Sequence, residues 1–376
     1  MRTRTRNLRG LGWAAPALLA VLAGPGGALA QETAQGEEDR RAPITIEKQG
    51  SFFFGGRLIT APGTYDPTAF LGNTGETFII DKGYVFFQIP PNARRYPLVM
   101  VHGGGQTGKT WEDFENREGY QSIFLRRGWS VYITDFMTRG KAGFTSFTGP
   151  LGQLLGEQIG PDSTIFYGFK SNFLAFRLGP SWPEGGNPEY YPNTQFPQTP
   201  YALRQLAAQT VPFFELQEKQ QSHAIGRNLA ALLKRIGPAI LITHSQSGVF
   251  GFLAAIKSSP NVKGIIAYEG SGIFPEGEAP PGGGLFPPIT VPLADFEKLI
   301  GIPIQMVWGD NTTEEQLANN RAFVEVVNSH GGNAELLLLP EAGLHGNTHF
   351  PFGDLNNHEV ADLLSQYLQE KGLAAQ

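Results

Sequence analysis

The sequence predicts an α/β fold in which a mostly parallel central sheet carries helices on both faces. Apolar, strand-like runs alternate with helical segments over most of the 376 residues, which is the pattern of consecutive β–α units. Glycine and proline are abundant, with 48 and 28 residues, and they separate the units as expected of a fold with long functional loops.

The elements are expected in a fixed order along the chain. Two opening strands lie within 44–56 and 83–90, where aromatic and β-branched residues gather. A short apolar strand, 96–102, ends at three glycines. The later elements are helix 111–127, strand 129–135, helix 215–235, strand 239–243, helix 247–258, strand 262–268, strand 303–308, helix 313–329, strand 335–339 and helix 357–371.

Residues 136–214 break this alternation. The segment is rich in aromatic residues, glycine and proline, and a structureless loop of that length is improbable in a compact domain unless it is functional. It predicts a cap inserted into a catalytic domain made of 42–135 and 215–376, with aromatic rings that line a pocket or form the cap's own core. A second irregular stretch, 270–292, is expected to form another pocket wall.

The first thirty residues have the features of a signal peptide. Four arginines precede an apolar stretch from Trp13 to Ala23, and Ala28-Leu29-Ala30 has the form of a cleavage site. The apolar stretch is too short and too often interrupted for a membrane span. This predicts a secreted or periplasmic protein without a stable membrane anchor, cleaved near Ala30. Residues 31–41 are polar and charged and are predicted to be a disordered lead-in.

Charge and cysteine content exclude several classes of protein. Removal of residues 1–30 takes away four arginines and no acidic residue, so the net charge moves from −5 to about −9. An acidic exported chain is poorly suited to nucleic acid or anionic membranes. The chain has no cysteine, which excludes disulfides, thiolate metal sites and cysteine nucleophiles. No metal or organic cofactor is expected, and the oligomeric state is not predicted.

The run 239–248 predicts a nucleophile. An apolar strand stops at His244 and Ser245, and a helix begins at Ser247. A serine at such a strand-to-helix turn is the nucleophile elbow of an α/β-hydrolase, with Oγ exposed above the sheet and the helix N-terminus facing the oxyanion. Thr243 and Ser247 replace the glycines of the usual pattern but are small enough for the turn. The alternative is that Ser245 merely caps a buried helix.

Two carboxylates are candidates for the acid that orients the base. Glu269 directly follows strand 262–268, and Asp310 follows strand 303–308, where most α/β-hydrolases keep their acid. Both lie at the carboxyl edge of the predicted sheet, where ligand chemistry takes place in such folds. Glu269 is the preferred acid and Asp310 the alternative, and either carboxylate alone would also suit a turn cap.

The loop after the last strand supplies the candidate base. His349 is preferred and His345 is the alternative, and the order serine, acid, histidine is that of α/β-hydrolases. Their spacing would suit a metal pair on a helix, but Gly346-Asn347 between them indicates a loop, so no metal site is predicted.

The glycines after strand 96–102 predict the oxyanion hole. The run of His102 and three glycines resembles the loop that supplies one oxyanion amide in lipases and esterases, here from Gly104 or Gly105. The second donor is expected to be the amide of Gln246, directly after the nucleophile. His102 is expected to be structural.

The same glycines also match a nucleotide-binding pattern. Residues 103–110, G-G-G-Q-T-G-K-T, satisfy the P-loop pattern between a strand and a helix, and Asp135 ends a strand of Walker B type. The export signal and the ordered hydrolase elements argue against a nucleotide hydrolase, which stays an alternative.

Four parts of the chain together resemble a small group of secreted bacterial carboxylesterases, the seven-thirteen esterases, which are α/β-hydrolases. These parts are 101–112, 242–248, Glu269 and 346–349. The resemblance is specific because the glycine-poor elbow is unusual. The chain departs from the group at Gly104-Gly105, where bulkier residues are expected, and the cap is the least recognisable part.

This resemblance implies a cap domain and a Ser–Glu–His triad whose acid follows the strand after the elbow helix. It therefore favours Glu269 over Asp310 and His349 over His345.

The sequence thus predicts a secreted serine carboxylesterase. Ser245 would attack an ester carbonyl, His349 would take the proton and return it to the leaving alcohol, and Glu269 would hold the imidazole while an acyl-enzyme forms and is hydrolysed. The alternative of another class is a catalytically silent α/β-hydrolase-fold protein that binds an apolar ligand under its cap. The sequence names neither acyl group nor alcohol, and amide, lactone and polyester substrates stay open.

Overall fold

The computed structural model describes residues 42–69, 72–143, 165, 167–213, 219–280 and 288–376. The chain divides into a unit Met1–Pro43 and a unit Ile44–Gln376, and the second contains all the elements below. The predicted signal peptide and the lead-in 31–41 lie outside the described residues. Within the described part, no helix is long and apolar enough to cross a membrane.

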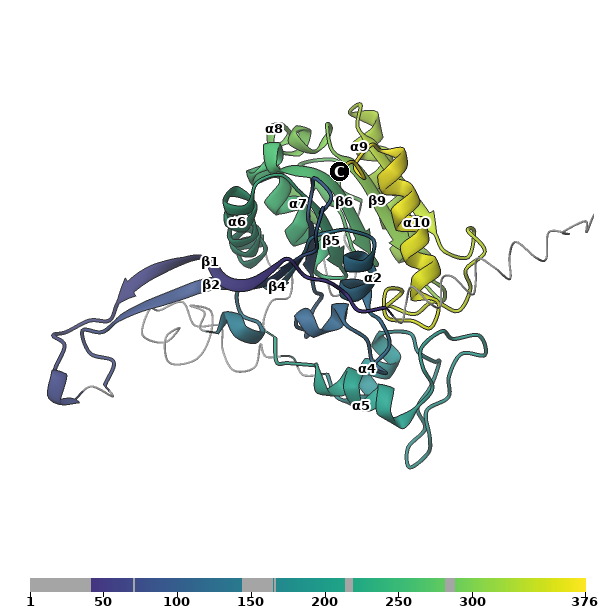
Figure 1. The fold of residues 1–376 in the computed structure, drawn as a ribbon, viewed down its shortest axis with the longest axis horizontal. Coiled ribbons are helices and arrows are strands. Elements are labelled where there is room, and N and C mark those ends of the chain that lie inside the picture. The colour runs from purple at the N-terminus through teal and green to yellow at the C-terminus, as the bar shows by residue number, and fades with distance from the viewer. Residues whose placement is uncertain (1–41, 70–71, 144–164, 166, 214–218, 281–287) are drawn as a thin grey trace, which may run out of the picture. The chain divides into compact units, whose positions relative to one another are not determined.

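An eight-stranded sheet forms the centre of this unit, with the strand order β1-β2-β4-β3-β5-β6-β9-β10 (Figure 1). The strands are β1 Lys48–Thr60, β2 Thr77–Ile89, β3 Leu98–Val101, β4 Val131–Asp135, β5 Ala239–His244, β6 Val262–Tyr268, β9 Pro303–Trp308 and β10 Asn333–Leu338. Neighbours from β4 through β10 in this order are parallel, while β1–β2 and β2–β4 are antiparallel. The predicted mostly parallel sheet is therefore confirmed.

Helices cover both faces of the sheet because alternate side chains of its central strands feed two separate cores. On β3, Val99 and Val101 join one core, whereas Leu98 and Met100 join the other. The first core is closed by α6 Lys219–Ile236, α7 Ser247–Lys257 and α9 Glu314–Ser329. The second is closed by α2 Tyr120–Arg126 and α10 Asn357–Glu370 (Figure 1).

The helix predicted over 111–127 was too long, since only Tyr120–Arg126 is α-helical. In the residues before it, the Asp113 carboxylate accepts the backbone N–H groups of Glu115 and Arg117. A side-chain acceptor that bonds nearby N–H groups competes with the helical ladder. The chain therefore turns through this stretch before the helix begins.

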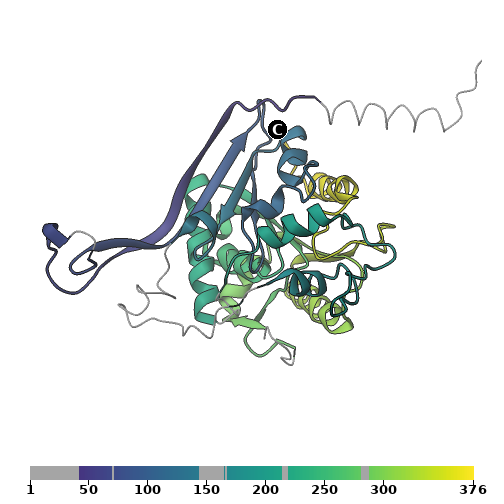
Figure 2. The ribbon, with the colours of Figure 1, turned by 90° about the horizontal axis from the view of Figure 1, so that it is seen from below.

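The two opening strands differ from their predicted bounds: β1 is as long as the predicted segment but displaced by four residues, and β2 begins six residues earlier. β1 and β2 pair along their length as far as Thr60 and Thr77, and the outer part of this hairpin projects away from the sheet, as Figure 2 shows. Phe53, Leu58 and Ile79 are exposed on it. The outer part of the hairpin was not predicted because its side chains face solvent and no burial pattern marks it.

The predicted cap segment contains helices that the sequence did not predict. They are α4 Phe169–Ala175 and α5 Pro200–Ala208, preceded by the 3₁₀ turn η3 Gly140–Ala142. Cap aromatics such as Phe173 and Phe196 belong to the same core as α2 and α10, so the described part of the cap extends a core of the main domain. The predicted cap residues 144–164 and 166 lie outside the described residues.

The second irregular stretch, 270–292, contains a small parallel sheet that was not predicted. It consists of β7 Ile273–Pro275 and β8 Ile289–Val291, and residues 281–287 between them are not described. The remaining short elements are η1 Pro67–Ala69, η2 Gly108–Trp111, η5 Ser259–Asn261, α8 Leu293–Phe296 and η6 Glu297–Leu299.

Candidate active site

Ser245 occupies a strained turn between β5 and α7. Its φ of +52° lies in the left-handed region, which non-glycine residues rarely adopt and which is often found at functional sites. Its N–H donates to the carbonyl of Tyr268 at 2.9 Å, and its own carbonyl accepts from the N–H of Gly248 at 3.0 Å. The strand–turn–helix context predicted around Ser245 is therefore present.

Ser247 and Gly248 let this turn close. The Ser247 hydroxyl is fully buried, lies 2.8 Å from the Val101 carbonyl and accepts the N–H of His244 at 2.9 Å. A Cβ on Gly248 would lie 2.9 Å from the carbonyl oxygen of Ser271. Ser247 is thus fixed inside the fold, and Ser245 is the partly exposed serine of the pair.

Of the predicted oxyanion residues, Gly104 and Gln246 lie together at the elbow. A Cβ on Gly103 would lie 3.0 Å from the Cβ of Ser245, and one on Gly104 would lie 3.1 Å from Oε1 of Gln246. Gly105 has a φ of +65°, and its carbonyl accepts the N–H of Val211 from the cap segment at 2.9 Å. The glycine loop therefore packs against the elbow at Gly103 and Gly104 and is bonded to the cap segment at Gly105.

Glu269 and His349 are brought together. Glu269 follows β6 with a φ of +55°, and its N–H donates to the Val307 carbonyl at 2.8 Å. Its carboxylate is fully buried: Oε1 accepts the N–H of Gly309 at 2.6 Å, and Oε2 lies 3.3 Å from Nδ1 of His349. This contact is the geometry expected between an orienting acid and a base.

The alternative acid and base lie to one side of this pair. The Asp310 carboxylate accepts the N–H of Asn347 at 3.1 Å, and it lies 4.0 Å from Nδ1 of His345. The His345 side chain is 63% exposed, whereas that of His349 is 10% exposed. Asp310 thus anchors the histidine loop through its backbone.

The loop that carries His349 is bonded to the strand that carries Ser245. Nε2 of His244 lies 2.8 Å from the His349 carbonyl oxygen, and His244 directly precedes the serine. The His349 N–H donates to the carbonyl of Phe176 at 3.0 Å, and the two rings stack at 3° and 5.4 Å. The imidazole is therefore held between the elbow and the cap.

The surroundings favour a charged Glu269 and a neutral His349. Burial lowers the pKa of His349, Arg177 lowers it further, and the contact with Glu269 acts in the opposite direction. Burial alone would raise the pKa of Glu269, but the nearby charge of Arg177 and the hydrogen bonds from His349 and Gly309 outweigh it and hold that pKa below its ordinary value.

Arg177 is the residue of this cluster that sequence reasoning missed. Its Nη2 lies 2.7 Å from Oε2 of Glu269, and its side chain is 10% exposed. The two residues are 92 positions apart and belong to the cap segment and the sheet. No motif in the sequence could have paired them.

The P-loop alternative does not fit the geometry. The glycine run leads into η2, a four-residue 3₁₀ turn, and the N–H of Gly108 is already bonded to the Asp135 carboxylate at 2.8 Å. The Lys109 ammonium donates to the Asp113 carbonyl and lies 3.1 Å from the Glu112 carboxylate. In a P-loop the backbone N–H groups of the glycine run and the lysine ammonium would instead face the phosphates of the nucleotide.

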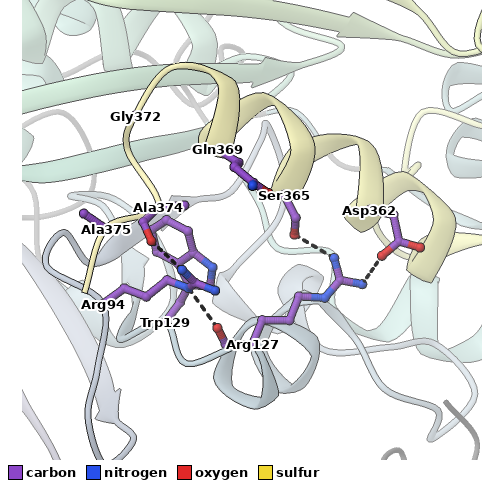
Figure 3. Close-up of a pocket in the computed structure, with 9 residues that line it drawn as sticks. All are labelled: Arg94, Arg127, Trp129, Asp362, Ser365, Gln369, Gly372, Ala374 and Ala375. Carbon is purple, nitrogen blue, oxygen red and sulfur yellow. Dashed lines mark hydrogen bonds and ion pairs between the residues drawn. The ribbon is translucent and has the colours of Figure 1, made fainter. Parts of the chain in front are cut away.

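No cluster of three or more histidine, aspartate and glutamate side chains able to hold a metal occurs among the residues that the structure describes. A surface groove of about 650 Å³ lies at the amino edge of the sheet, beside Trp129 and Arg94 before β4 and β3 (Figure 3). Arg94 there bonds the Ala374 carbonyl, and Arg127 bonds Asp362. The groove is at the edge opposite the elbow, and its arginines hold the chain's own C-terminal segment.

Comparisons with known proteins find a lipase and an esterase that are similar to this chain. No family model matches the chain. It is 26% identical over 341 residues to the probable secreted lipase phiG of a fungal species (strain ATCC 74256), covering 80% of this chain and 89% of that protein. The solved structure of a novel bacterial esterase is 30% identical, has a TM-score of 0.72, and is matched over 88% of this chain and 98% of the esterase.

Proposed function

The chain belongs to the α/β-hydrolase superfamily, in the family of the bacterial esterase that it matches, and we propose that it is a secreted serine carboxylesterase with Ser245, His349 and Glu269 as its triad. An ester-hydrolysing enzyme of α/β-hydrolase fold follows from the family. The observation that carries the finer proposal is the buried contact between Glu269 and His349, on a loop bonded to the strand of Ser245.

The mechanism follows from the hydrogen bonds of the base. Because Nδ1 of His349 faces the Glu269 carboxylate, that nitrogen carries the proton and Nε2 is left as the proton acceptor. Nε2 takes the Ser245 proton as Oγ attacks the ester carbonyl, and it returns that proton to the departing alcohol. Water then attacks the acyl-enzyme by the same route and releases the carboxylic acid.

Backbone amides stabilise the oxyanion in this proposal. Gly104 or Gly105 supplies one N–H and Gln246 the other, and the contact of Gly104 with the Gln246 side chain supports this placement. Such donors act on charge that develops only in the transition state, which is why they accelerate the reaction.

Export and a small-molecule ester substrate complete the proposal. The basic, apolar and A-x-A parts of residues 1–30 support a signal peptide, and the relative phiG is described as secreted. The acidic net charge supports a partner other than nucleic acid.

A fluorophosphonate probe tests the nucleophile. We expect the mature protein to be labelled at Ser245, and Ser245→Ala to lose labelling and on the order of 10⁴-fold or more in kcat, as other triad serines do. Ser247→Ala is the matched control, which should keep labelling at Ser245 while losing stability, because the Ser247 hydroxyl is buried and bonded.

A folded parent protein that neither reacts with the probe nor hydrolyses p-nitrophenyl esters of any chain length would instead support the silent binding protein. In an active enzyme, the same ester panel identifies the preferred acyl length.

A further inference from the structure

Arg177 is placed rigidly at the end of a cap helix. It follows α4 with a φ of +57°, in the left-handed region. Its N–H donates to the Leu174 carbonyl at 3.2 Å, and the N–H of Leu178 donates to the Phe173 carbonyl at 3.1 Å, so the last carbonyls of α4 are satisfied. A left-handed residue at this position turns the chain sharply and aims the side chain into the site.

The guanidinium makes three contacts with the catalytic cluster. Nη2 lies 2.7 Å from Oε2 of Glu269, Nε donates to the Asp310 carbonyl at 3.0 Å, and Nη1 lies 3.4 Å from Nδ1 of His349. Arginine and the protonated Nδ1 are both donors, so they do not bond each other. Both instead face the single oxygen Oε2, and a fixed positive charge stands beside the imidazole.

We propose that Arg177 is a positioning residue of the reaction: it holds Glu269 ionised and in place, and it opposes the charging of His349, so that the cap sets the pH at which the enzyme becomes active. This inference rests on the proposed function, because it takes Glu269 as the acid and His349 as the base. It adds that the cap completes the triad and is not only a cover over it.

Backbone bonds beside Arg177 support a role that belongs to the cap. The Phe176 carbonyl accepts the N–H of His349, and the N–H of Gln195 donates to the Gly346 carbonyl at 2.7 Å. The cap segment thus bonds the histidine loop at His349 itself and at Gly346, three residues before it. A buried ion pair of this kind is costly to break from one side only, because the remaining carboxylate stays buried without its partner.

The other titratable groups around His349 do not mask the effect. His244 contacts it from β5, and burial lowers the pKa of His244 well below its ordinary value, so that this ring stays neutral. Asp310 and His345 lie on the outer side of the loop. Asp354 interacts with Glu269, and burial raises its pKa to about 7, but its hydrogen bonds come from Asn347 and Thr348 and not from Arg177.

The test compares parent, Arg177→Met and Arg177→Lys by the pH dependence of kcat/KM and of the fluorophosphonate labelling rate. Methionine keeps an unbranched, flexible stem but lacks the guanidinium group and its charge. We expect the acidic limb of both profiles to move upward by about one pH unit in Arg177→Met, because the imidazole no longer faces a cation. Arg177→Lys should keep the limb within a few tenths of a unit of the parent.

Arg127→Met is the matched control. It removes an arginine paired with a carboxylate, Asp362, at 2.6 Å at the opposite edge of the sheet (Figure 3), and its acidic limb should coincide with that of the parent. If Arg177→Met does not fold, Arg177→Met/Glu269→Gln removes both charges together. Its kcat/KM should lie within about twofold of Glu269→Gln alone, because residues that act as a unit are not additive.

Two results would overturn the role of Arg177 and leave the proposed esterase function intact. One is a folded Arg177→Met whose pH profiles keep the acidic limb of the parent. The other is a double variant whose kcat/KM lies far below that of Glu269→Gln. A parent that is not labelled at Ser245 overturns the proposed function, and this inference with it.

Discussion

Ser245 and Glu269 stand at corresponding positions of adjacent strands. Each directly follows its strand with a positive φ, +52° and +55°, and each donates its N–H to the carbonyl at the end of the next strand. A left-handed backbone conformation at a non-glycine residue costs on the order of 1–3 kcal/mol of folding free energy, and it persists only where the surroundings enforce it. Here the register of β5, β6 and β9 enforces it, and it turns both side chains out at one edge of the sheet.

The sequence predicted the residues at this edge but not how they are supported. An apolar run that ends at a polar residue marks a strand end, which is why Ser245, Glu269 and Asp310 were all candidates. The choice between Glu269 and Asp310 needs tertiary contacts, since both follow buried parallel strands. Arg177 was out of reach because its partner is distant in sequence.

Amide substitution separates the two candidate acids. Glu269→Gln should lose several orders of magnitude in kcat, because a neutral amide neither stabilises the imidazolium nor fixes the correct tautomer, and the loss is about 10⁴-fold in a comparable triad. Asp310→Asn should stay within about tenfold of the parent, since among the described residues its carboxylate accepts the backbone N–H of Asn347 and lies 4.0 Å from the exposed His345. The measurement is kcat at a fixed pH for both variants.

The two histidines are compared in the same way. His349→Ala should be inactive, and His345→Ala should keep most of its activity. A His349→Ala enzyme that turns over normally would transfer the role of base to His345 and would contradict the proposed triad.

At the scale of elements, the helices and strands of the parallel core were predictable and those of the cap were not. β3 and β5 are buried on both faces and read as continuous apolar runs, and α9 begins at a capping box formed by Thr313 and Gln316. α4 and α5 have seven and nine residues and take their stability from contacts with the main core. Helices this short are marginal on their own, so local pattern carries little signal for them.

A substitution in the histidine loop tests whether the cap and the loop must fit closely. Gly346 has a φ of +82°, and a Cβ there would lie 1.6 Å from the carbonyl oxygen of Asn193, so Gly346→Ala must push the cap segment away. We expect at least a tenfold loss of kcat/KM. Because this contact is backbone against Cβ, no side-chain rotation can relieve it.

Gly343→Ala is the control for backbone strain. Gly343 has almost the same φ, +83°, but nothing lies within 4 Å of the added Cβ. It should lose about 1 kcal/mol of stability and keep its activity. Equal activities of the two variants would show that the contact with Asn193 is dispensable.

At the scale of the whole molecule, the main domain and the cap share one core and one set of buried charges. The predicted cap segment supplies Arg177 to Glu269 and the Phe176 carbonyl to the His349 loop, which couples this segment to the proposed triad. The same interior holds groups that stay uncharged in the fold: burial lowers the pKa of His102 to about 4 and that of His244 well below its ordinary value. A histidine whose pKa is lower in the folded than in the unfolded protein contributes stability in its neutral form. This stability is fully present above the unfolded pKa, about 6.5, and is lost as the pH falls below it.

Asp354 has the opposite effect on the pH dependence of stability, so its hydrogen bonds can be tested by unfolding at different pH. Burial raises its pKa from 3.8 to about 7, although Oδ2 accepts the N–H of Thr348 at 2.7 Å and Oδ1 lies 2.8 Å from the Thr348 hydroxyl. A carboxyl group whose folded pKa is raised contributes stability that is full below its unfolded pKa and is lost as the pH rises through the folded one. Asp354 therefore destabilises the fold progressively from about pH 4 to pH 7.

Asp354→Asn should remove this pH dependence. An asparagine imitates the protonated acid: its oxygen accepts from the Thr348 N–H, and its amide donates to the Thr348 hydroxyl oxygen. From pH 4 to 7 the free energy of unfolding of the variant should rise relative to that of the parent, by up to roughly 4 kcal/mol, and the difference should then level off. Urea unfolding at half-unit pH steps measures it directly. The histidines cancel in the comparison because both proteins contain them. A difference that stays constant over this range would mean that the pKa of the buried Asp354 is not raised, because the bonds from Asn347 and Thr348 fully offset its burial.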